Sequence, residues 1–138
     1  MEKMNINFFD NDRDLVMLWY DISIKKIDEN YYYSFKLRIK RSIFMVETEF
    51  KWFSLSDIHL FIMKLEKMYR EDSLTIHLNP LGEFFALEFK RERSGRIEAK
   101  VYIYNEIGNL ELNYSFDQTF LPELIEELKN SMIISDHR

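Results

Sequence analysis

The chain carries the same strand-to-helix pattern twice, and this repeat restricts its possible folds more than any other feature. Residues 116–132 read as the end of a strand followed by an amphipathic helix, because apolar residues recur with helical spacing. These apolar residues are Leu121, Leu124, Ile125, Leu128 and Met132. When Phe53 is laid over Phe116, a matching set falls beneath them without a gap: Ile58, Phe61, Ile62, Leu65 and Tyr69. We therefore predict two strands-then-helix halves whose helices are structurally equivalent.

The residues before each apolar set predict where the helices begin. Thr119 and Ser56 occupy matching positions, and a hydroxyl there can accept a hydrogen bond from a backbone N–H of the first turn. Pro122 then falls in the first turn of the second helix, where its missing N–H costs no hydrogen bond. We expect the first helix to run from about Ser56 to Tyr69.

Runs of alternating apolar and polar residues precede both helices and predict about eight strands. The fold class is α+β, with antiparallel sheet covered by two helices in a single domain, 1–138, made of halves 1–70 and 71–138. Periodicity leaves open whether the strands form one curved sheet or two packed sheets. A two-residue turn at Arg41-Ser42 would place Ile39 opposite Phe44, Leu37 opposite Val46 and Lys36 opposite Glu47. The last two strands should pair Leu110, Leu112, Tyr114 and Phe116 with Ile103, Val101, Ala99 and Ile97.

The composition excludes several kinds of chemistry. Cysteine is absent, which rules out disulfides, thiolate metal ligands and cysteine nucleophiles. The formal net charge of -5 disfavours nucleic-acid binding and favours a basic partner. The sequence shows no secretory leader and no apolar run of membrane-spanning length, so we expect a cytoplasmic protein.

No motif predicts catalysis, a cofactor or a metal ion. The histidines, His59, His77 and His137, lack any metal-ligand spacing, and the sequence has neither a phosphate-binding glycine loop nor a G-x-S-x-G motif. Asp10, Asp12 and Asp14 are spaced like the start of a calcium loop, but the required glycine is replaced by Leu15 and the bidentate glutamate by Asp21. We interpret the three aspartates as a solvated turn.

Three groups of side chains are candidates for binding a protein partner. The first is the acidic turn of Asp10, Asp12 and Asp14, and the second is Glu123, Glu126 and Glu127 on the second helix. The helix carboxylates already stabilise the positive end of the helix dipole, so the turn is the better candidate for an electrostatic contact. The third group consists of tyrosines that the strand alternation places on the outward, polar face: Tyr32, Tyr102 and Tyr104. Aromatic side chains often anchor protein interfaces.

The terminal block F-D-Q-T-F-L-P-E-L-I-E-E-L, residues 116–128, resembles the C-terminal signature of WapI-type bacterial immunity proteins. The order of the remaining elements agrees, with an N-terminal hairpin, long strands, Phe53-Ser54-Leu55 leading into a helix, and a second strand set. This resemblance implies an antidote to a contact-dependent toxin, whose C-terminal domain is typically a nuclease. It implies no active-site residues for this chain.

We expect a non-catalytic protein that binds and occludes a toxin domain. One alternative is a carrier that holds a small molecule or peptide between the sheet and its helices, with Phe and Met side chains lining the space. An enzyme is the third possibility, and the sequence offers no nucleophile–base pair or metal set to support it.

Overall fold

A computed structural model describes residues 4–71, 74–79, 84–104 and 108–133 of this chain. The chain forms two four-stranded antiparallel sheets, which resolves the choice between one sheet and two. The first sheet contains β1 (Ile6–Phe9), β2 (Leu15–Ile27), β3 (Asn30–Arg41) and β4 (Phe44–Ser54). The second contains β5 (Leu74–Leu78), β6 (Phe85–Arg91), β7 (Arg96–Tyr104) and β8 (Asn109–Asp117). Each sheet is a simple meander in sequence order.

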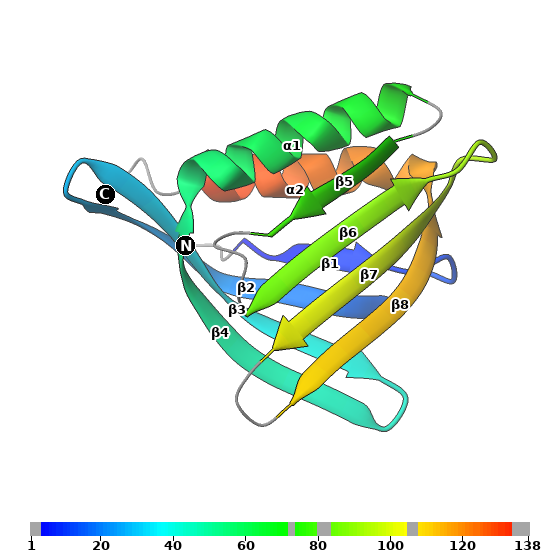
Figure 1. Ribbon diagram of the computed structural model, residues 1–138, viewed down its shortest axis with the longest axis horizontal. Coiled ribbons are helices and arrows are strands. Elements are labelled where there is room, and N and C mark those ends of the chain that lie inside the picture. The colour runs from blue at the N-terminus through cyan, green and yellow to red at the C-terminus, as the bar shows by residue number, and fades with distance from the viewer. Residues whose placement is uncertain (1–3, 72–73, 80–83, 105–107, 134–138) are drawn as a thin grey trace.

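A helix follows each sheet, so the predicted strands-then-helix halves are present. Helix α1 (Leu55–Arg70) follows β4, and α2 (Leu121–Ile133) follows β8 after the short 3-10 turn η2 (Gln118–Phe120). Figure 1 shows the two helices side by side, covering the same side of the sheets. Each helix also crosses to the other half, because α1 contacts β5 and α2 contacts β1. No described helix is long and apolar enough to cross a membrane.

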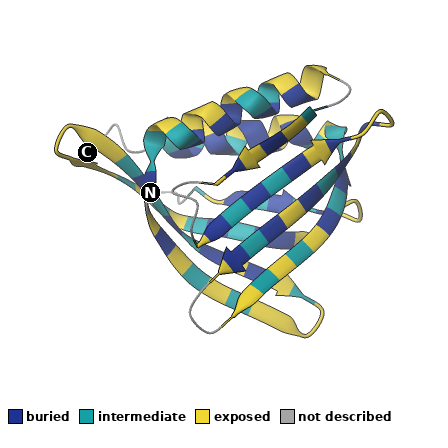
Figure 2. Ribbon diagram, in the orientation of Figure 1, coloured by how far each residue is buried: buried dark blue, intermediate teal, exposed yellow. Residues whose placement is uncertain are grey.

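The core lies between the two sheets and beneath the helices. Strand residues alternate between buried and exposed, as Figure 2 shows for the second sheet. Aromatic rings join the layers: Trp19 of the first sheet lies 6.1 Å from Phe85 of the second, and Phe50 lies 5.1 Å from the same ring. Trp19 also stacks on Phe35 at 4.1 Å. This shared core makes the two sheets one packed unit.

The buried positions of the two helices match each other as predicted, with one correction. Four predicted pairs are buried, but the fifth buried pair is Met68 and Ser131, one residue earlier than the predicted Tyr69 and Met132. Tyr69 is 46% exposed. Ser131 can lie in the core because its hydroxyl donates to the Leu128 carbonyl at 2.7 Å and pairs with the Tyr33 hydroxyl at 2.8 Å.

The predicted helix caps are wrong. Residue 56 lies inside α1, and the residue before that helix is Ser54, whose hydroxyl bonds Ser56 Oγ at 2.7 Å and caps no backbone group. Thr119 lies inside η2, where its backbone N–H donates to the Asp117 carboxylate at 3.0 Å. A carboxylate two residues earlier therefore takes the role that we predicted for the threonine hydroxyl.

The register of the β3–β4 hairpin also differs from the prediction. Its turn is Ser42-Ile43, so Ile39 faces Val46, Leu37 faces Thr48 and Lys36 faces Glu49. Ser42 has a φ of 58°, the left-handed conformation that a tight two-residue hairpin turn requires. The shift is two residues, so Val46, Thr48 and Phe50 keep their inward parity. Phe44 is 68% exposed, and a further register shift after Phe50 places Phe53 in the core. The predicted pairing of β7 with β8 is confirmed.

Candidate partner-binding surface

The acidic turn between β1 and β2 is organised by the carboxylate of Asp10. Its Oδ1 accepts hydrogen bonds from the backbone N–H groups of Asp12 and Asp14, at 2.9 and 3.0 Å, and its Oδ2 lies 2.8 Å from Nη1 of Arg41. Burial disfavours the ionised form of Asp10, but the bonds from Arg41 and the two amides outweigh this effect and lower its pKa. Asp10 is buried, whereas Asp12 and Asp14 are exposed. Asp10 therefore shapes the turn, and the other two carboxylates face solvent.

These three aspartates do come close together, with their oxygens within 4.8 Å of one another. Both oxygens of Asp10 are already engaged, and the Arg41 guanidinium beside them repels a cation. The geometry explains the acidic turn as a local hydrogen-bonded structure. The sequence interpretation as a solvated turn fits the exposed Asp12 and Asp14 but not the buried Asp10.

Arg13 joins the acidic turn to the start of α2. Its guanidinium carbon lies 4.9 Å from the ring centroids of both Phe9 and Phe120, which places the cation against two aromatic faces. Nη1 of Arg13 is also 3.5 Å from Oε1 of Glu123. The two acidic groups that the sequence presents as separate candidates therefore form one surface, which we call the acidic surface: Asp12, Arg13, Asp14, Glu123 and Glu126.

Glu127 does not belong to this exposed set. Its two carboxylate oxygens accept hydrogen bonds from the backbone N–H and the side-chain amide of Asn7, at 2.8 and 3.1 Å. Burial raises the pKa of Glu127, and the two bonds from Asn7 offset part of that rise. Glu127 thus fastens α2 to β1, while Glu126 on the same helix is exposed.

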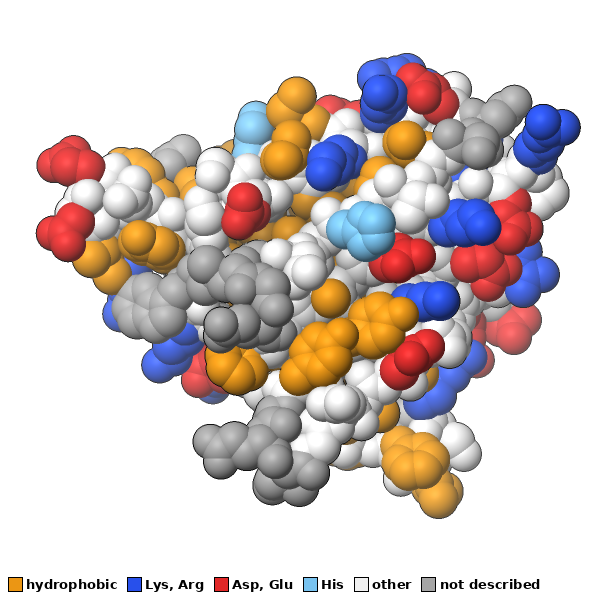
Figure 3. Space-filling model, viewed as in Figure 1, with side chains coloured by type: hydrophobic (Ala, Val, Ile, Leu, Met, Phe, Trp, Pro, Cys, Tyr) orange, Lys and Arg blue, Asp and Glu red, His pale blue; other side chains and the backbone are white. Residues whose placement is uncertain are grey.

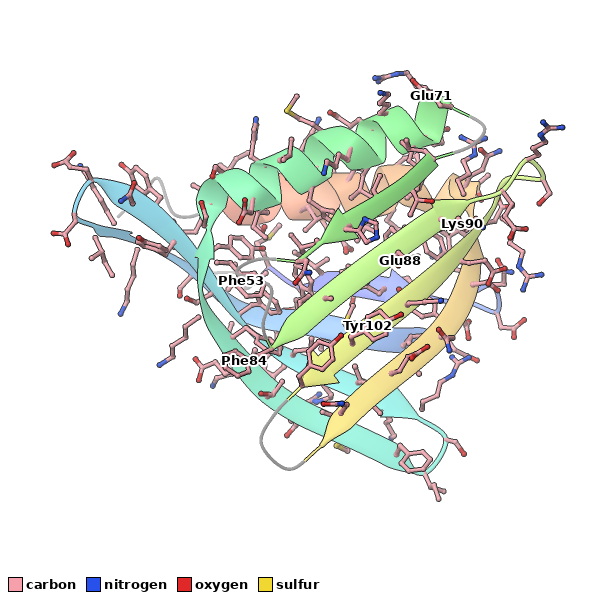
Figure 4. The ribbon with its side chains drawn as sticks, in the orientation of Figure 1. Phe53, Glu71, Phe84, Glu88, Lys90 and Tyr102 are labelled. Atoms are coloured by element: carbon pink, nitrogen blue, oxygen red, sulfur yellow. The ribbon has the colours of Figure 1, made fainter. Side chains whose placement is uncertain are left out.

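Two of the three candidate tyrosines lie together on the second sheet. Tyr102 and Tyr104 lie on the outer face of the second sheet, with ring centroids 6.2 Å apart and planes at 3°. Figure 4 shows the Phe84 and Tyr102 side chains close together on this face. In Figure 3 a hydrophobic patch with acidic side chains beside it lies over the same strands. Phe84 is 58% exposed, so this corner of the sheet presents aromatic surface to solvent.

The comparison with protein families decides what kind of protein this is. The model of the immunity protein WapI-like family matches residues 8–132, which is most of the chain. The chain belongs to the WapI-like immunity protein family. Membership indicates a role in toxin immunity and implies a cognate toxin as the partner. No curated protein matches the chain.

A solved structure supports the fold but not the function of this WapI-like protein. The chain is similar to MRP1/MRP2 of Trypanosoma brucei, with 12% sequence identity and a TM-score of 0.50. The match covers 94% of this chain and 83% of the other. At this identity the likeness concerns the fold alone.

Tyr32 lies far from the acidic surface, at the other end of the first sheet. The acidic turn precedes β2, and Tyr32 follows the hairpin turn at the opposite end of that long strand (Figure 1). Tyr32 lines an open groove of about 760 Å³ between this hairpin and the first turn of α1, together with Tyr31, His59 and Met132. The structure therefore does not bring Tyr32 together with the other candidate residues.

One cavity between the sheets and α2 is too small to hold a ligand. The cavity lined by Phe8, Tyr114, Phe116 and Leu124 has a volume of about 10 Å³, roughly that of one water probe. A bound small molecule needs a pocket of about 300–1,000 Å³. This cavity does not support the sheet–helix alternative, and the groove beside Tyr32 is a larger space.

Sequence reasoning missed three residues that position the candidate carboxylates. Arg41 holds Asp10, Arg13 connects the turn to Glu123, and Asn7 holds Glu127. Each of these contacts joins residues at least thirty-one positions apart in the chain, since the separations are 31, 110 and 120. Arg13 alone gave a local signal, as the only cation within a run of aspartates.

Proposed function

We propose that this protein neutralises a cognate toxin domain by binding to it directly and covering its active site. The observation that carries the proposal is the family match over residues 8–132. The fold supports it, because the core lies between the sheets and beneath the helices, which leaves the outer sheet faces to contact a partner.

The acidic surface favours a basic partner, and a nuclease is our proposed toxin class. Asp12, Asp14, Glu123 and Glu126 set four exposed carboxylates around the guanidinium of Arg13, whereas the neighbouring Arg41 and Arg96 are paired with Asp10 and Glu98. Nucleases bind phosphate backbones through basic residues, so an acidic antidote can cover the cleft and be steered to it. Exposed charges of this kind act mainly on the association rate.

A growth assay tests the proposal. A candidate toxin domain, sought immediately upstream of this gene, is induced in bacteria with or without the immunity protein, and growth and co-purification are measured. We expect restored growth and a complex that survives purification. Continued growth arrest in cells that contain the soluble immunity protein contradicts the proposal.

A matched pair of variants tests the acidic surface within the same assay. Asp12→Asn with Asp14→Asn removes two charges from the surface and leaves Asp10 in place. The control, Asp28→Asn with Glu29→Gln, removes two charges from the turn at the opposite end of β2. We expect the first pair to slow association with the toxin by roughly tenfold at low salt and less at high salt, and the control to have little effect. Equal effects of the two pairs would show that only net charge matters.

The open groove beside Tyr32 favours a second candidate function, binding of a peptide or small molecule. Its volume of about 760 Å³ and its tyrosine and methionine lining suit such a ligand. Thermal-shift screening of the wild type against Tyr32→Ala tests this candidate. A ligand that stabilises only the wild type supports it, and a screen without hits counts against it.

A further inference from the structure

The outer face of the second sheet carries an aromatic corner that the acidic surface does not include. It consists of Phe84, Tyr102 and Tyr104. The Tyr104 backbone N–H donates to the Phe84 carbonyl at 3.0 Å, which fixes the two residues beside each other. Tyr102 lies opposite Ala86 of β6, and an alanine methyl group is too short to cover a tyrosine ring. The rings are therefore held in place but left partly open to solvent.

An exposed carboxylate lies next to these rings. Glu111 of β8 is exposed and directly opposite Tyr102 in the β7–β8 ladder. Its hydrogen bond in the structure is from the Asn113 amide at 3.4 Å. Lys100 lies on the same face, between Glu88 of β6 and Asn113 of β8 and diagonal to Glu111, and none of the ion pairs found among the described residues includes Glu111. The corner thus combines open aromatic faces with an exposed carboxylate that is free to pair with a partner's cation.

Strand β8 connects this corner to the acidic surface. Its outward residues after Glu111 are Asn113 and Ser115. The Ser115 carbonyl accepts a hydrogen bond from the backbone N–H of Asn11, in the acidic turn, at 3.0 Å. Four residues of strand span roughly 13 Å, so one interface of ordinary size reaches from Glu111 to the turn.

We propose that the aromatic corner and Glu111 hold a cationic side chain of the toxin, best an arginine, and that the toxin contact continues along β8 to the acidic surface. An arginine can stack on the tyrosine rings while its guanidinium donates hydrogen bonds to the carboxylate. The inference rests on the proposed immunity function and names the anchor of that contact. A nucleic-acid phosphate would be repelled by Glu111 and Glu88.

The test measures dissociation of the wild-type toxin from three variants and a control. Tyr102→Ala with Tyr104→Ala removes the rings, Tyr102→Phe with Tyr104→Phe keeps them without the hydroxyls, and Glu111→Gln removes the charge. The control is Tyr31→Ala, which removes a tyrosine that is 50% exposed at the far hairpin. Loss of a hot-spot aromatic should accelerate dissociation roughly thirtyfold or more. The phenylalanine pair and the control should dissociate within about threefold of the wild type, because the ring faces remain.

The outcomes separate this inference from the proposed function. If the wild type binds the toxin and the alanine pair dissociates at the wild-type rate, the aromatic corner is not the anchor, although immunity stands. If the alanine pair fails to fold by circular dichroism, Glu111→Gln decides, since an exposed isosteric change should leave the fold intact. An unchanged affinity and salt dependence of Glu111→Gln then overturns the inference. The inference would also be overturned if the wild type bound a single-stranded oligonucleotide and the alanine pair did not, because the aromatic corner would then recognise nucleic acid.

Discussion

At the scale of single residues, the three aspartates of the acidic turn have different roles. Asp10 is buried and accepts three hydrogen bonds, one of them from a guanidinium, whereas Asp12 is exposed. We predict that Asp10→Ala lowers the free energy of unfolding by about 2–4 kcal/mol, since it removes a paired, largely buried charge. Asp12→Ala should change it by less than about 0.5 kcal/mol. Urea denaturation of the two variants measures the difference, and equal effects would contradict the assignment.

The lowered pKa of Asp10 also has a consequence for acid stability. A carboxyl whose pKa is lower in the folded state contributes stability above its ordinary pKa, and that contribution is lost as the pH falls through the folded value. We predict that the wild type and Asp10→Asn converge in stability as the pH is lowered below about 4. Denaturation curves at several acidic pH values test this. A difference that stays constant with pH would mean that Asp10 acts through packing alone.

Glu127 shows the opposite linkage. Its pKa is raised by burial, so the ionised form is disfavoured in the folded protein, and stability is lost as the pH rises through that raised value. In Glu127→Gln both bonds to Asn7 can be kept if the Asn7 amide is reversed. We predict that this variant equals or exceeds the wild type at pH 7, by up to about 1 kcal/mol, and that its advantage shrinks in acid. Glu127→Ala, which loses both bonds, should be destabilised and serves as the control.

At the scale of elements, the repeat was readable from the sequence and its exceptions were not. The helical spacing of the apolar residues that begin at Ile58 and at Leu121 is a local pattern, so it predicts both helices. The fifth buried position was misassigned because Ser131 is polar by type, and only its distant partner Tyr33 makes it a core residue. The hairpin register was missed for a similar reason, because Ser42 in a left-handed conformation has no strong sequence signal.

The Tyr33–Ser131 hydrogen bond joins β3 of the first half to α2 of the second. It is buried, and burial raises the pKa of Tyr33, so the phenol is neutral at ordinary pH. We predict that Tyr33→Phe and Ser131→Ala each cost about 1–2 kcal/mol of stability. The double variant should cost less than the sum, because the second change removes a group already without its partner. Additive costs would show that the two hydroxyls do not depend on each other.

At the scale of the whole molecule, the candidate surface could be predicted only in pieces. The sequence supplied Asp12, Glu123 and Tyr102 as candidates, but the neighbourhood that Asp12 and Glu123 share depends on contacts between the two halves. Arg13 links the turn to α2, and Ser115 links it to β8. These contacts span most of the chain, so no local pattern reports them. Whether the surface binds the toxin is a proposal that the charge and tyrosine variants test.

Because each helix contacts a strand of the other half, we expect cooperative unfolding. Helix α1 packs on β5 and α2 packs on β1, so each half lacks part of its cover without the other. We predict a single transition, with the secondary structure and the aromatic environment lost at the same urea concentration. Far- and near-ultraviolet circular dichroism measure the two signals. Two separated transitions would show that the halves behave as independent domains.

Immunity through stoichiometric occlusion of a toxin is tested most directly by an activity titration. Purified toxin domain, at a concentration well above the dissociation constant, is mixed with increasing amounts of this protein, and the remaining toxin activity is measured. Occlusion predicts a linear loss of activity that ends at a fixed molar ratio and is reversed when the complex is denatured and the toxin refolded. Inactivation by substoichiometric amounts, increasing with time and surviving refolding, would contradict occlusion and indicate an enzyme that modifies the toxin.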